Sequence, residues 1–287
     1  MILSDSHPVT ACRLYVLTAP EAATALVLRR GPTRWWHLLE WDLAHLTLTP
    51  GAWFHGTLYP RRCDISPDGR LFGYFAMKGS FSHPSSSNPS WPGEYFAVSR
   101  SPWLQALAGW QTCGTWTWGC RFSATGHLEI RACMHREPFH GGYPGGFSAE
   151  SMSTDWQKRD VWNELKRGWE IAADNVPATG LALRRAQPGG GGVSLGLIHL
   201  GVDFKRPGME GVQLEYFLQD NPRDVTPLPE AVWADWDREG RLLMATRSGA
   251  LEVHRCHGAK LHREWSEDLR DRTPDPRPAP AWASGWR

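Results

Sequence analysis

The chain has 287 residues, of which 41% are hydrophobic and 21% are charged, and its net charge is close to +1. This composition is that of a globular protein with a sizeable core, and it excludes a disordered chain. The 31 basic residues are scattered along the chain and balanced by 30 acidic ones, which argues against nucleic-acid binding through a concentrated basic face.

No apolar run approaches the roughly 18 to 20 residues that a membrane-spanning helix requires. The first ten residues, MILSDSHPVT, lack the basic start and the long apolar core of a signal peptide. The sequence therefore predicts a cytoplasmic protein without a membrane partner.

A segment with the pattern of two short strands around a tight turn recurs about every 55 residues. Four copies carry a glycine six residues past their first position, namely Gly69, Gly126, Gly180 and Gly240. The predicted hairpins lie near residues 12–30, 63–77, 120–134, 174–186 and 234–248. A fixed period of this size indicates a repeat architecture, because one unit cannot bury its apolar face without a neighbour.

Each hairpin is followed by further strand candidates. Third strands are predicted at 35–43, 94–100, 160–169, 212–219 and 250–256, and fourth strands at 45–50, 104–110 and 260–265. The segment at 160–169, DVWNELKRGW, fits a helical turn equally well. Tryptophans at matched spacing, such as Trp103 with Trp110 and Trp162 with Trp169, are expected to pack between adjacent sheets.

The SPDG turn at 66–69 resembles the repeats of WD40-like bacterial β-propellers, and this resemblance covers one hairpin. The other turns read SATG, PATG and DREG, and the GH and WD dipeptides of WD40 blades are absent in register. The resemblance implies a propeller and no particular activity. Five units of about four strands predict an all-β fold, a five-bladed β-propeller of mostly four-stranded antiparallel blades. It would occupy residues 1–268, with a proline-rich tail at 269–287.

The tail has four prolines in alternation, which favours an extended chain, and it ends near Trp282 and Trp286. These rings either dock back on the domain or anchor a partner.

Long insertions at 79–93, 134–158 and 187–192 are predicted to share one rim of the propeller. Long loops that a compact fold does not need are often functional, although they can also simply cover sheet edges. The candidate partner-binding residues are aromatic or histidine side chains in or near these loops: Trp53, His55, Tyr59, His83, Trp91, Trp116, His140, Tyr143 and Trp156.

The sequence favours a non-catalytic binding or assembly module that recognises a protein partner through this loop-rich face. The alternative is a carbohydrate-binding or glycoside-hydrolase-like propeller. Hydrolysis needs two carboxylates about 5 to 10 Å apart. The candidates Asp64, Asp174 and Asp235 lie just before tight turns, where an aspartate usually accepts backbone N–H hydrogen bonds. Phosphate-loop, GxSxG and HExxH motifs are absent, so no catalytic residue is assigned and enzymatic activity stays an open question.

The six cysteines form no CxxC pair of the zinc-binding type, and they are expected to be inert buried thiols. His254, Cys256, His257 and His262 make up the one local grouping with metal-ligand chemistry. Because only His254 and Cys256 would share a strand face, neither a metal nor another cofactor is predicted.

Overall fold

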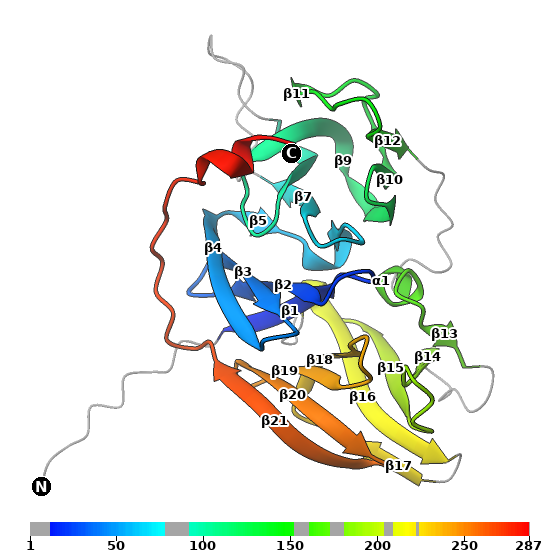
Figure 1. The fold of residues 1–287 in the computed structure, drawn as a ribbon. Helices are drawn as coiled ribbons and strands as arrows, with labels where there is room; N and C mark the ends of the chain where they lie inside the picture. The colour runs from blue at the N-terminus through cyan, green and yellow to red at the C-terminus, as the bar shows by residue number, and fades with distance from the viewer. Residues whose placement is uncertain are drawn as a thin grey trace, which may run out of the picture.

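The structure is a computed structural model that describes residues 12–77, 92–151, 161–172, 181–203, 209–221 and 224–286. These residues fold almost entirely as β-strands, arranged in four hydrogen-bonded sheets with predominantly antiparallel pairing (Figure 1). The predicted all-β class is confirmed.

The first sheet holds four strands in chain order: β1 (Arg13–Thr18), β2 (Thr24–Arg30), β3 (Trp35–Asp42) and β4 (Thr47–His55). The predicted hairpin at 12–30 is the β1–β2 pair, whose register runs from Arg13 opposite Arg30 to Thr18 opposite Ala25. The middles of β2 and β3 are buried, which explains their nearly continuous apolar sequences.

The second sheet is larger because one long strand belongs to two halves of it. The first 6 residues of β9 (Ala106–Ala124) pair with β8, whereas its last part pairs with β10. Gly114, between the two halves, and Gly119, within the part that pairs with β10, adopt φ angles of 114° and 109°, which favour glycine. The other strands are β5 (Thr57–Leu58), β6 (Asp64–Ile65), β7 (Leu71–Met77), β8 (Glu94–Arg100), β10 (His127–Met134), β11 (His140–Gly141) and β12 (Ser148–Ser151).

The third sheet follows a short helix, α1 (Trp162–Leu165), so the ambiguous segment at 160–169 begins as a helical turn. Its strands are β13 (Glu170–Ile171), β14 (Leu181–Ala186), β15 (Ser194–Val202), β16 (Val212–Asn221) and β17 (Asp224–Pro227).

The turn of the hairpin predicted at 174–186, with Gly180, lies outside the described residues. On either side of it β13 pairs with β14, with Glu170 opposite Arg184. β14 also pairs with β15, a strand that was not predicted, across residues 187–193. The turn forms in QPGGGG, where Gly189, Gly190 and Gly192 have φ angles of 81°, 79° and 76°. Three glycines that tolerate positive φ favour this turn.

The fourth sheet contains β18 (Ala231–Trp236), β19 (Leu242–Thr246), β20 (Ala250–His257) and β21 (Lys260–Asp268). Its first turn matches the SPDG turn of the second sheet. Gly240 and Gly69 have φ angles of 75° and 79°, and each donates its N–H to the carbonyl three residues earlier. The sequence repeat at these two positions is therefore a repeat of backbone geometry.

The sheets pack through their first strands and through polar contacts between the two ends of the chain. β1 contacts β6 of the second sheet and β18 of the fourth. The buried Arg29 donates to the carbonyls of Leu269 (2.5 Å) and Arg270 (2.7 Å), and Arg241 donates to the carbonyl of Leu43 (2.6 Å). These bonds tie the first sheet to the fourth.

The C-terminal tail docks on the domain. It runs past β4 to the second sheet, where η4 (Ala281–Ser284) lies against β8 (Figure 1, orange to red). Trp286 donates its indole N–H to the carbonyl of Gly142 (2.8 Å), and its ring lies 4.6 Å from that of Phe147.

Candidate functional site

Two cavities lie at opposite ends of the β1–β2 hairpin. The first has a volume of about 660 Å³ and includes Thr18, the last residue of β1. The second has a volume of about 430 Å³ and includes Arg30, which pairs with the first residue of β1. Both volumes fall in the range of ligand pockets.

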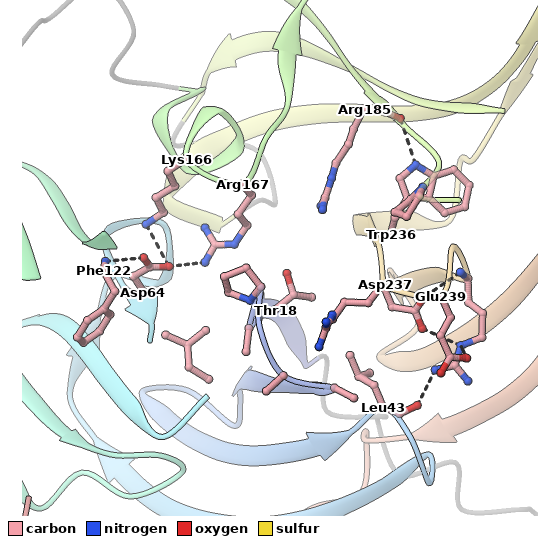
Figure 2. A pocket seen from close by; sticks show the side chains of 18 residues that line it. Thr18, Leu43, Asp64, Phe122, Lys166, Arg167, Arg185, Trp236, Asp237 and Glu239 are labelled. Atoms are coloured by element: carbon pink, nitrogen blue, oxygen red, sulfur yellow. Dashed lines mark hydrogen bonds and ion pairs between the residues drawn. The ribbon is translucent and has the colours of Figure 1, made fainter. Parts of the chain in front are cut away.

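The first cavity receives residues from all five sequence repeats, including Thr18, Asp64, Phe122, Arg185 and Trp236. Figure 2 shows these side chains around one space, with Lys166, Arg167 and Arg185 along one wall.

The second cavity combines four aromatic rings with polar and charged side chains. It is lined by Trp36, Tyr59, Trp116 and Trp118, and Val202 contributes an exposed apolar edge. The side chain of Trp116 lies at the bend of β9 and is 74% exposed, the highest value among the large hydrophobic residues of the described chain. The next most exposed tryptophan among the described residues, Trp282, is 50% exposed.

A buried polar network separates the two cavities. Asn163 lines the second cavity, whereas Lys166 and Arg167, one turn later, line the first. Glu164 accepts hydrogen bonds of 2.9 Å from Arg61 at both carboxylate oxygens, and Asn163 donates to the hydroxyl of Tyr15. The segment 162–169, which begins with α1, therefore lies between the two cavities, and we call it the plug. The side chains of Tyr15 and Arg61 hold it in place.

Lys166 is fully engaged in this plug. Its ammonium donates to the carbonyls of Cys63 (2.9 Å) and Cys120 (3.0 Å), and it lies 3.7 Å from Asp64. Burial lowers the pKa of Lys166 to about 8, and the nearby Asp64 carboxylate offsets part of that effect.

Glu210 lies in the second cavity with its backbone in the left-handed region, at φ 57°. Burial raises the pKa of Glu210 to about 7, and Arg62 and Arg61 offset this only in part. The Arg62 guanidinium Nε is 4.0 Å from its Oε1, an oxygen that accepts no hydrogen bond from any described residue. When Glu210 is ionised, neighbouring side chains therefore compensate its negative charge only weakly.

Asp64 and Asp235 occupy structural positions. Asp64 accepts the backbone N–H of Phe122 (3.0 Å), and Asp235 accepts that of Trp236 (2.9 Å). Each also pairs with an arginine, Arg167 and Arg185 respectively. Asp174 lies outside the described residues. Both described aspartates therefore accept a backbone N–H, but the donor to Asp64 lies on β9 and not in the turn that follows Asp64.

Two of the nine predicted binding residues meet in one site, since Tyr59 and Trp116 both line the second cavity. Trp53 instead stacks on His37 at 4.1 Å, and His55 lies 5.0 Å from the ring of Trp35. This second group of rings packs along β3 and β4 and does not line the cavity.

The remaining predicted residues divide into two sets. His140 begins β11, and Tyr143 packs near Trp110 and Phe147, so both lie with the second sheet's outer strands and the tail. His83, Trp91 and Trp156 lie outside the described residues.

The shared rim predicted for the three insertions stays a prediction, because most of residues 79–93 and part of 134–158 lie outside the described residues. The loop at 187–192 contributes Pro188 to the first cavity. The described part of 134–158 folds along β9 and β10 through β11 and β12.

The expectation of six buried thiols is wrong for Cys113 and Cys133, which are exposed, while Cys256 is half-buried. Burial raises the pKa of the Cys120 thiol to about 12, so this thiol is inert near neutral pH. Across the described ranges, no group of three or more His, Cys, Asp or Glu side chains could hold a metal ion. His254 instead contacts Glu252 at 2.8 Å.

The sequence reasoning missed the cationic wall of the first cavity. Its signal was the run Glu164, Lys166 and Arg167, three charges between the buried Trp162 and Trp169. Charged residues enclosed by an apolar pattern indicate a buried polar network rather than a surface strand.

Comparison with protein-family models and with curated proteins gives no match. Among solved structures, the chain is similar to the Pyrococcus horikoshii acylaminoacyl peptidase (orthorhombic crystal form), at 9% identity and a TM-score of 0.28. The match covers 90% of this chain and 45% of the peptidase, so the chain spans less than half of that protein's length. A likeness of this size establishes neither a shared fold nor a shared activity. Within the described part of the chain, no helix has the length and apolar character needed to cross a membrane.

Proposed function

We propose that the chain is a five-bladed β-propeller of mostly four-stranded blades that acts as a non-catalytic binding module for a protein partner. The convergence of all five repeats on the first cavity supports the propeller. So does the contact of β1 with both β6 and β18, because a ring brings its first and last units together. In this arrangement β9 belongs to two blades, which accounts for the large second sheet.

The observation that carries the functional proposal is the exposure of Trp116 at the mouth of the second cavity, beside the exposed Val202. Tryptophan is enriched among the residues that dominate protein–protein binding energy. An exposed apolar group next to a concave aromatic wall is suited to receive a partner's apolar side chain.

The charged side chains around the second cavity complete the features of an interface. Arg30, Arg62 and Glu210 line it together with the aromatic rings. Protein interfaces commonly combine an aromatic centre with a polar surround, in which arginine is enriched. The weakly compensated Glu210 would favour a partner that brings a hydrogen-bond donor or a cation.

The test is affinity purification of the tagged full chain from its native host, followed by binding measurements with the purified partner. We expect a stoichiometric protein that binds the wild type and loses about thirtyfold or more in affinity for Trp116→Ala, a typical hot-spot loss. Trp282→Ala is the matched control, because Trp282 is 50% exposed but lies on the tail. Equal binding by Trp116→Ala, or the absence of any stoichiometric partner, would contradict the proposal.

The carbohydrate alternative is tested on the same variants with a glycan array. Exposed aromatic rings also stack on sugars, so Trp116 would be needed there too. Saturable binding of a glycan that is lost in Trp116→Ala, without a protein partner, would favour the alternative. Turnover of that glycan would contradict the non-catalytic assignment.

A further inference from the structure

The first cavity has a cationic wall opposite an apolar one. Lys166, Arg167 and Arg185 lie along one side in Figure 2, and Leu43 lies across the space from them. Ala22 and Ala23 extend the apolar lining beside Leu43. A molecule in this cavity therefore meets three cations along one side and an apolar lining across from them, which borders the charged Asp237, Glu239 and Arg241.

The lining carries more positive than negative charge. Five of its side chains are cationic and three are carboxylates. Lys166 and Arg167 share the single carboxylate of Asp64, and Arg185 pairs with Asp235, which is buried behind the wall. Even with Asp235 included, the cations exceed the carboxylates by one, and this excess lies where water is partly excluded.

Arg167 has hydrogen-bonding capacity that its protein partners do not use. Its side chain is 10% exposed; Nη2 donates to Asp64 (2.7 Å) and Nη1 to the carbonyl of Asn163 (3.2 Å). The buried Nε has no hydrogen-bond partner among the described residues. A buried donor without an acceptor leaves the charge of this guanidinium incompletely compensated, which favours an anion nearby.

We propose that the first cavity binds a small amphipathic oxyanion, a phosphate or carboxylate group attached to an apolar body. Arg167 and Arg185 bind the oxyanion, because a guanidinium matches the geometry of carboxylate and phosphate oxygens. The body lies over Ala23 and Leu43. Lys166 adds positive charge without direct contact, since its donors already bond to two carbonyls. This site is independent of the partner face around Trp116.

The experiment measures binding of four probes to the full chain by isothermal titration calorimetry at constant ionic strength. The probes are phenyl phosphate, phenylacetate, inorganic phosphate and benzyl alcohol. We expect phenyl phosphate or phenylacetate to bind most tightly, inorganic phosphate to bind more weakly, and benzyl alcohol not to bind. The better of the two aromatic anions identifies the oxyanion.

Two variants locate the binding. Arg185→Gln removes one arm of the anion site, and Ala23→Glu places a negative charge on the exposed apolar wall without disturbing a buried pair. Each is expected to weaken the aromatic anion about tenfold or more, the usual effect of losing or opposing a charged hydrogen bond. Ala124→Glu is the control, because Ala124 is exposed on the β9–β10 hairpin and does not line the cavity.

The proposal is overturned if neither aromatic anion binds better than benzyl alcohol. It is also overturned if both bind but Ala23→Glu, with an unchanged melting temperature, binds them as the wild type does. Should Arg185→Gln fail to fold because Asp235 loses its partner, Ala23→Glu alone decides the outcome.

Discussion

Arg167 donates a 2.7 Å hydrogen bond to Asp64, a residue 103 positions earlier in the chain. The same carboxylate accepts the backbone N–H of Phe122. The Asp64 side chain of β6 therefore connects β9 to the turn that follows α1. Both partners are largely buried. Asp64 therefore fixes the position of the plug between the two cavities.

Replacing Asp64 with asparagine should destabilise the protein by about 3 kcal/mol, since a buried cation that loses its counterion is strongly unfavourable. Lys166 can lose its proton, whereas Arg167 cannot. The measurement is urea unfolding near pH 7. Asp275→Asn is the control, because Asp275 and Arg277 form an exposed ion pair that should contribute little. Equal stability of the two variants would show that the plug does not depend on this pair.

The sequence was sufficient to predict the strands where local signals agree. β3, β8, β16 and β20 form at the predicted third-strand segments, and the turns at Gly69 and Gly240 share their geometry. It did not predict β15, which follows the turn at 187–193 and pairs with β14. Trp236 donates to the carbonyl of Arg185, a long-range bond that no local pattern encodes.

The bend of β9 gives a comparison of two glycines in one strand. Gly119 has a φ of 109°, and a Cβ there would lie 2.5 Å from the Cα of Arg62. Gly114 has a φ of 114° and no heavy atom within 4 Å of such a Cβ. Gly114→Ala should lose about 1 to 2 kcal/mol of stability from backbone strain alone. Gly119→Ala should lose roughly 2 kcal/mol more, because the backbones of β9 and η1 (Pro60–Arg62) must separate.

Urea unfolding of both glycine variants checks this difference. If the two alanine substitutions cost the same, the close approach of β9 to η1 contributes nothing to stability.

The docked tail predicts a local effect of Trp286. Trp286→Ala removes the hydrogen bond to Gly142 and the packing on Phe147, so the tail should detach while the sheets stay folded. Limited trypsin digestion should then cleave after Arg270 or Arg272 several times faster than in the wild type. Trp282→Ala, which removes a half-exposed ring, should change the rate less. Unchanged cleavage in Trp286→Ala would mean that other contacts hold the tail.

The binding face was predictable only in part. Tyr59 and Trp116 are conspicuous as aromatics near repeat boundaries, and both line the second cavity. Val202 and Glu210 are not conspicuous, because they reach it only once β15 and β16 adopt a register that the sequence did not predict. The residues of the plug were hidden for a related reason: their charges have partners more than 100 positions away, as in Arg61 with Glu164.

Glu210 should make stability depend on pH in a defined direction. Its pKa rises from 4.5 to about 7 on folding, so the folded state binds more protons than the unfolded state between these values. Its contribution to stability is therefore complete below pH 4.5 and is lost as the pH rises through about 7. Glu210→Gln, which is neutral throughout, removes this loss. The free energy of unfolding of the variant relative to wild type should increase by roughly 2 to 3 kcal/mol between pH 5 and pH 8. Urea unfolding at both pH values measures it, with the exposed Glu170→Gln as control. A difference that stays constant with pH would show that Glu210 is already ionised in the folded protein at pH 5, and that Arg61 and Arg62 compensate its charge fully.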